Sequence, residues 1–222
     1  MIDKRVYDFD AALAGMADGA RIMSGGFGAA GAPHELLEAV LERGSRDLVI
    51  ISNNAGEGER GLIRLLQNGR VAKVICSFPT SSNSEIVKEL YAAGRIELEI
   101  VPQGTLSERM RAAGAGIGGF YTRTSVGTPL GEGKELRHFD GEDYVLERPL
   151  HADFAFVRAK RADRWGNLVY NKAARNFGPT MAMAAETTVV QVDAFVELGA
   201  LDPEHIVTPG IYVDRVIEVR GA

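Results

Sequence analysis

Apolar runs alternate with amphipathic stretches along the first half of the chain. Residues 20–26 (ARIMSGG) predict a strand, and residues 33–44 predict a helix that Pro33 opens and Gly44 closes. Inside this helix, leucine and valine side chains recur at helical spacing while glutamates occupy the other face. The same alternation continues, with strands expected over 47–52, 71–78 and 95–101 and helices over 61–69, 82–94 and 105–116.

Strands separated by single helices are typical of βαβ units. We therefore expect an α/β fold with an open, mostly parallel sheet and helices on both faces. In the helix over residues 105–116, Thr105 is the expected N-cap and Glu108 completes a capping box.

The pattern changes after residue 120. Asp140-Gly141 lies between two β-rich runs in residues 134–150 and predicts a hairpin turn. Trp165-Gly166-Asn167 predicts another turn, with Trp165 packed on the core or on a partner. We expect residues 1–222 to form a single domain whose C-terminal part is rich in β-hairpins. Its remaining elements are strands over 152–160, 166–170, 187–192 and 211–219 and a helix over 179–186.

Composition narrows the class of protein. The chain has 222 residues, 45% of them hydrophobic, which is enough for a substantial core. Its net charge of -5 argues against a nucleic-acid-binding protein. No apolar run approaches the roughly 18 residues of a membrane span, and the charged start lacks a secretory signal. Cys76 is the single cysteine, and the four histidines are scattered. We therefore expect a cytoplasmic protein with no disulfide, metal site or membrane contact.

Residues 24–33 (SGGFGAAGAP) contain G-x-G-x-x-G at Gly26, Gly28 and Gly31. A dinucleotide site also needs an acid at the end of the second strand, to hold the ribose hydroxyls. Here that strand ends in Ser-Asn-Asn, and Asp47 stands at its beginning. The nicotinamide interpretation is therefore disfavoured. Two alternatives stay open: a loop whose backbone approaches an anionic ligand, and a tight turn between strand and helix.

A longer pattern surrounds these glycines. Residues 18–33 resemble the signature of the A (alpha) subunit of family I CoA-transferases: Asp-Gly, two residues, three apolar residues, Gly-Gly-Phe, three residues, Gly, one residue, Pro. Ser24 departs from it, because a third apolar residue is usual there. Further blocks match in order and cover nearly the whole chain: 52–56, 101–128, 139–147, 152–170, 172–179 and 208–219.

The resemblance implies an open α/β sheet and transfer of CoA from succinyl-CoA to a 3-oxo acid. Residues 74–104 resemble the 3-oxoadipate branch of the family. Acetoacetate-type members more often carry Ser-Tyr-x-Gly-Glu-Asn where this chain has residues 77–82. In the family, a glutamate in a Ser-Glu-Asn-Gly segment of the B subunit carries CoA as a thioester. That segment is absent from this sequence, so we expect a B subunit to complete the site, in a heterodimer or an A2B2 assembly.

The resemblance also assigns candidate site residues. Asn53, Asn54 and Gln103 lie in the active-site blocks of the family, past the ends of predicted parallel strands, where open sheets bind ligands. Their amides could stabilise an oxyanion; alternatively, the asparagines shape a turn and Gln103 ends a strand. Coenzyme A and succinyl-CoA enter as substrates, with no bound cofactor. The CoA-contact segment is Gly25, Gly26, Phe27, Gly28, Ala29, Ala30 and Gly31.

Two further observations leave alternatives open. Residues 158–175 carry six basic side chains against one acid, a cluster that could meet CoA, the partner or only solvent. The α/β pattern also suits other classes of protein. A stand-alone phosphosugar isomerase or deaminase on a related fold would act without a partner, and a non-catalytic ligand-binding protein would not use these amides.

Overall fold

The structure is a computed structural model that describes residues 2–80 and 84–219. Its strands are β1 (Arg5–Val6), β2 (Arg21–Ser24), β3 (Leu48–Asn54), β4 (Val71–Phe78), β5 (Glu97–Ile100), β6 (Phe120–Thr122), β7 (Leu136–Phe139), β8 (Glu142–Glu147), β9 (Ala152–Ala162), β10 (Leu168–Val169), β11 (Ala185–Phe195) and β12 (Arg215–Glu218). Its α-helices are α1 (Phe9–Ala12), α2 (His34–Arg43), α3 (Leu62–Gln67), α4 (Ser84–Ala92), α5 (Gln103–Gly114) and α6 (Gly178–Ala184).

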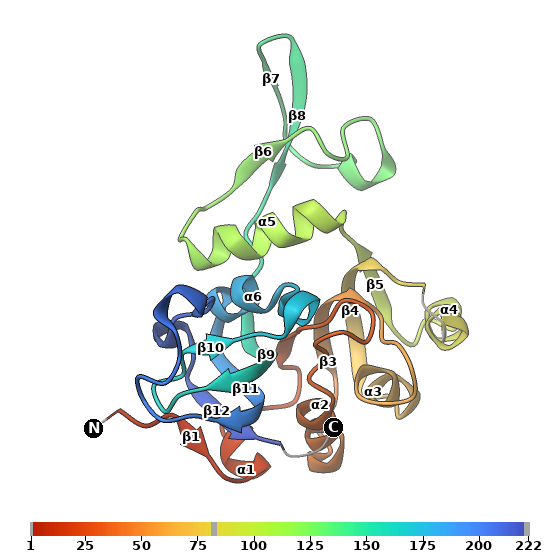
Figure 1. Ribbon diagram of the computed structural model, residues 1–222. Helices are drawn as coiled ribbons and strands as arrows, with labels where there is room; N and C mark the ends of the chain where they lie inside the picture. Colours follow the sequence, from red (N-terminus) through yellow and green to blue (C-terminus); the bar gives the residue numbers. More distant parts are fainter. Residues whose placement is uncertain (1, 81–83, 220–222) are drawn as a thin grey trace.

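A nine-stranded sheet forms the body of the molecule, in the order β1-β12-β11-β9-β2-β3-β4-β5, with β10 paired to β9 (Figure 1). All pairs are parallel except β10 with β9. The chain runs from β2 outward to β5, then returns on the other side of β2 as β9. The expected open, mostly parallel sheet is therefore confirmed, and its order reverses between β2 and β9.

Helices cover both faces of this sheet because alternate strand residues belong to different cores. Ile50 of β3 packs in the cluster that contains residues of α2, α3 and α4. Its neighbour Ile51 packs with residues of α5 and α6. Val74 and Ile75 divide in the same way on β4. Side chains of a strand point to opposite faces in turn, so a run of apolar residues fills two layers at once.

A second sheet, β6-β8-β7, stands apart from the body beyond α5 (Figure 1). Its hairpin is confirmed: Phe139 pairs with Glu142, and the two residues between them have φ 48° at Asp140 and 84° at Gly141. Two positive φ values fit a type I′ turn, whose twist matches that of the flanking strands. The long strands after residue 150 return to the main sheet, so this excursion holds most of the antiparallel pairing.

The expected N-cap at Thr105 is wrong. Helix α5 begins at Gln103, with Pro102 as its N-cap, and Thr105 lies buried inside the first turn. The Pro102 carbonyl accepts from the Leu106 N–H at 2.8 Å, so proline starts the helix where a polar cap was expected. This shift places Gln103 on the helix and not at the end of a strand.

One expectation in the C-terminal part needs correction. The strand expected over 211–219 is shorter, because Gly210–Tyr212 forms a 3-10 turn before β12. A Cβ at Gly210 would lie 2.2 Å from the Trp165 carbonyl oxygen, so the turn fits closely against the loop between β9 and β10. The Trp165 side chain is 43% exposed, so of its two expected places, the core and a partner, the structure excludes the core.

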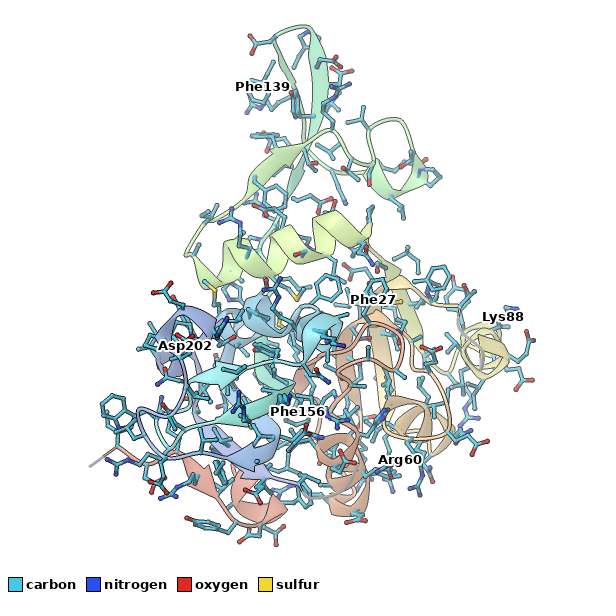
Figure 2. The ribbon with its side chains drawn as sticks, in the orientation of Figure 1. Phe27, Arg60, Lys88, Phe139, Phe156 and Asp202 are labelled. Carbon is cyan, nitrogen blue, oxygen red and sulfur yellow. The ribbon has the colours of Figure 1, made fainter. Side chains whose placement is uncertain are left out.

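Replacing Phe156 with alanine tests the central packing. Phe156 is fully buried in β9 and packs with Phe154, whereas Phe139 in the outer sheet is 44% exposed (Figure 2). Phe156→Ala should lower the free energy of unfolding by about 3–5 kcal/mol, because it leaves a cavity. The control Phe139→Ala should cost about 1 kcal/mol, from its edge contacts with two tyrosines. Urea denaturation of the purified chain measures both; equal losses would contradict this packing.

Candidate active site

Polar side chains gather at the carboxyl edge of the sheet, over β3, β4 and β5. Asn53 lies at the end of β3, Ser77 at the end of β4, and Gln103 opens the helix that follows β5. The glycine loop, residues 25–31, follows β2 immediately beside them. Open α/β sheets bind ligands at this edge, near the point where the strand order reverses.

A hydrogen-bond network joins the three side chains. The Asn53 amide oxygen accepts from Ser77 Oγ at 2.8 Å and from Gln103 Nε2 at 2.7 Å. Ser77 Oγ also lies 3.0 Å from the Asn53 backbone oxygen. Asn53 is 5% exposed, so its amide orientation is set mainly by these two donors. The structure thus brings Asn53 and Gln103 into direct contact.

Strand alternation explains why these residues meet. Asn53 has the same parity as Ile51 on β3, and Ser77 has the same parity as Ile75 on β4; both isoleucines face α5 and α6. Side chains two residues apart lie on one face of a strand. Asn53 and Ser77 are therefore directed toward the face on which α5 begins, and Gln103 is the first residue of that helix.

The glycine loop turns tightly without room for side chains at some positions. The Phe27 and Ala30 backbones exchange two hydrogen bonds, at 3.1 and 3.2 Å. Gly28 and Gly31 have φ of 60° and 75°. A Cβ at Gly31 would lie 2.2 Å from the Ala174 carbonyl oxygen. Phe27 itself is 54% exposed at the tip of the loop.

The Asn176 side chain, 150 residues after Gly26 in the sequence, hydrogen-bonds to this loop. Its Oδ1 accepts from the Gly26 N–H at 3.0 Å, and its Nδ2 donates to the Ala30 carbonyl at 3.2 Å. The same side chain bonds its own segment through the Phe177 N–H and the Ala174 carbonyl. Both amide ends of Asn176 are therefore used, and they join the loop to the segment before α6.

An open cleft of about 640 Å³ lies between the loop and the three-residue network. Among the described residues that line it, Glu57 is the sole charged side chain. The Glu57 carboxylate lies against Gly28, where a Cβ would approach it to 2.6 Å. Arg60 lies nearby but pairs with Glu35 at 3.0 Å. The described lining is Phe27, Gly28, Asn53, Asn54, Glu57, Ser77, Phe78, Thr80 and Gln103.

Asn54 and the start of α2 form hydrogen bonds that stabilise the fold around the site. The Asn54 side-chain oxygen accepts from the Gly56 N–H at 3.1 Å, which shapes the turn after β3. At the start of α2, the Leu36 N–H donates to Gln191 Oε1 at 3.3 Å. Burial lowers the pKa of His34, whose Nδ1 has no hydrogen-bond partner among the described residues.

The basic segment 158–175 is divided by the fold. Arg158 pairs with Asp193 at 3.2 Å. Asp163 is buried and accepts from the Trp165 and Asn167 backbone N–H groups. Lys160 and Lys172 line a separate hollow beside residues 29–31.

The single thiol is buried, and the described residues contain no cluster of metal-binding side chains. Cys76 is fully buried in β4, and burial raises the pKa of its thiol to about 12, which suits a packing residue. No group of three or more potential metal-binding side chains occurs in residues 2–80 and 84–219. Within the same ranges, no helix is long and apolar enough to cross a membrane.

The known proteins that this chain resembles in sequence and in fold are coenzyme A transferases. A family model described as Coenzyme A transferase matches residues 6–219. The A subunit of 3-oxoadipate CoA-transferase from Pseudomonas putida is 61% identical over 222 residues, covering 100% of this chain and 96% of the relative. Its counterpart from Acinetobacter baylyi is 56% identical over 221 residues, covering 100% and 97%. Glutaconate coenzyme A-transferase from Acidaminococcus fermentans shares the fold, with a TM-score of 0.86 at 21% identity over 98% of this chain and 76% of that chain.

Sequence reasoning missed Ser77, Asn176 and Glu57. Ser77 lies in a predicted strand, and only the register of β3 against β4 places it beside Asn53. Asn176 is separated from Gly26 by 150 residues, so no local pattern links them. Glu57 follows Asn53 closely, and its place in the SNNAGE segment was the available signal.

A matched pair of glycine substitutions tests the loop. Gly31 and Gly44 both have positive φ, but only Gly31 would drive a Cβ into backbone; Gly44 has nothing within 4 Å. Gly44→Ala should cost about 1–2 kcal/mol of unfolding free energy, from φ strain alone. Gly31→Ala should cost at least about twice as much, because the Ala174 carbonyl must move. Thermal unfolding of the two variants measures the difference, and equal midpoints would contradict the close approach.

Proposed function

The chain belongs to the coenzyme A transferase family, and we propose that it is the A subunit of an enzyme that moves CoA from succinyl-CoA to 3-oxoadipate. The observation that carries the proposal is the Asn53–Ser77–Gln103 network beside the glycine loop, at the ligand-binding edge of the sheet. The two relatives at 61% and 56% identity, both named as the A subunit of a 3-oxoadipate CoA-transferase, support the choice of acceptor.

The chemistry proceeds by carboxylate exchange on a thioester. A glutamate supplied by the partner attacks the carbonyl carbon of succinyl-CoA. The CoA thiolate is expelled, and the product is a mixed anhydride of succinate and the glutamate side chain. The thiolate then attacks the glutamyl carbonyl, which releases succinate and leaves CoA on the glutamate as a thioester. The same two steps in reverse transfer CoA to the 3-oxo acid. Bonds broken and formed are alike on both sides, so the exchange needs no ATP.

Each attack passes through a tetrahedral oxyanion, and amide donors can stabilise it. Since Ser77 and Gln103 occupy the Asn53 oxygen, the Asn53 nitrogen is the end left to donate toward the cleft. Gln103 Nε2 keeps a second N–H after its bond to Asn53. We assign Asn53 and Gln103 to the oxyanion, and Asn54 to shaping the adjoining turn.

The glycine loop, residues 25–31, is proposed to form one wall of the CoA site. Its exposed tip and its small residues let a pantetheine chain approach the backbone. Binding energy from the remote parts of CoA can then be used to bring the thioester to the reacting groups. We place the assembled enzyme in the cytoplasm, as a heterodimer or an A2B2 heterotetramer, with residues 1–222 acting as one domain.

Reconstitution with a B subunit that carries Ser-Glu-Asn-Gly tests the proposal. The isolated chain should show no transferase activity, because the glutamate that carries CoA lies in the partner. The pair should convert succinyl-CoA and 3-oxoadipate with a higher kcat/KM than succinyl-CoA and acetoacetate, measured by the absorbance of the product thioester. A strong preference for acetoacetate would assign the acetoacetate-type activity instead. Activity of the isolated chain on phosphosugars would overturn the transferase assignment.

Asn53→Asp in the reconstituted enzyme tests the orientation of the amide. The substitution keeps the oxygen that accepts from Ser77 and Gln103, but it turns the donor in the cleft into a negatively charged acceptor. The kcat should fall by at least about 10²–10³, the loss typical of one oxyanion donor. Asn54→Asp should lose less, because its bonded oxygen is retained outside the network. A wild-type kcat for Asn53→Asp would contradict the assignment.

A further inference from the structure

We propose that Ser77 is a positioning residue, whose hydroxyl fixes the Asn53 side chain so that its amide nitrogen is directed into the cleft. The inference rests on the proposed function, in which Asn53 donates to the reacting carbonyl oxygen. It adds a third residue to the site, one that acts through Asn53 and does not itself contact the reacting atoms.

The geometry separates the two ends of the Asn53 amide. An amide oxygen has two lone pairs, and an amide nitrogen has two hydrogens to donate. At Asn53 the oxygen has two donors, Ser77 Oγ at 2.8 Å and Gln103 Nε2 at 2.7 Å. A half-turn of the amide would break the bond from Gln103. It would also require Ser77 Oγ to accept from the Asn53 nitrogen and to donate its proton to the Asn53 backbone oxygen, which lies 3.0 Å away. The Asn53 amide nitrogen is therefore directed away from Ser77 and Gln103.

Ser77 is the more rigid of the two donors. It lies in β4, between the register pairs Cys76 with Ser52 and Phe78 with Asn54. On its other side, Cys76 pairs with Ile100 of β5. Gln103, by contrast, is an exposed side chain at the first position of a helix. A donor fixed by two neighbouring strands is the one that can hold Asn53 before substrate arrives.

The fixed orientation of the Asn53 amide should have a measurable effect on kcat. The terminal torsion of an asparagine is broad and nearly two-fold, so an amide with one donor can turn and present its oxygen to the cleft. An oxyanion facing that oxygen would be repelled. A donor that is already oriented costs no reorganisation during the reaction. Loss of the Ser77 hydroxyl should therefore lower kcat more than it weakens substrate binding.

Substitution of Ser77 in the reconstituted enzyme tests the inference. Ser77→Ala should lower kcat by about tenfold or more, short of the loss of a whole oxyanion donor, with KM for succinyl-CoA within about twofold. Ser77→Thr keeps a hydroxyl on a strand that tolerates β-branched residues, and it should restore most of kcat. The matched control is Ser45→Ala, a buried serine at the opposite end of the sheet, which should leave kcat unchanged.

A double-mutant cycle shows whether Ser77 acts through Asn53. In an Asn53→Ala background, Ser77→Ala should cause no further loss of kcat. An equal further loss would mean an independent role and would overturn the inference, as would a wild-type kcat for Ser77→Ala alone. If Asn53→Ala itself retains full activity, the proposed role of Asn53 fails, and the inference fails with it. Thermal unfolding of each variant confirms that the compared proteins are folded.

Discussion

The contact between the glycine loop and the segment around Asn176 is the constraint on which the rest of the site depends. One side chain bonds Gly26 and Ala30 across a separation of about 150 residues, while Gly31 fits against the Ala174 carbonyl. The loop follows β2, and Asn176 precedes α6 and β11. The two halves of the sheet, which meet where β2 pairs with β9, are thereby joined again at the edge that carries the cleft.

A second network orients the polar groups that this frame surrounds. Asn53, Ser77 and Gln103 come from three successive parts of the fold, and their hydrogen bonds meet at the Asn53 amide oxygen. The described lining otherwise brings one carboxylate, Glu57, and no cation. On the proposed function the substrates are themselves anionic. Arg60 lines the adjoining hollow, which shares Gly28 and Glu57 with the cleft.

The sequence was sufficient for those features that depend on local pattern. Apolar runs between amphipathic stretches predicted the strands and helices of the first half, and Asp140-Gly141 predicted the hairpin, because turn type and φ are local properties. The start of α5 was misplaced because Pro102 took the role expected of Thr105. Ser77 and Asn176 could not be found in this way, because strand register and long-range contacts bring them to the site.

The alternation of strand residues ties the active-site chemistry to the phase of the strands. A one-residue insertion or deletion within β3 would exchange the faces of Ile50 and Ile51 and would turn Asn53 toward α2 and α3. Core packing and donor geometry would thus be lost together. Length changes in this lineage are therefore expected to accumulate in the outer β6–β8 excursion, which carries none of the Asn53 network, and to be purged from β3 and β4.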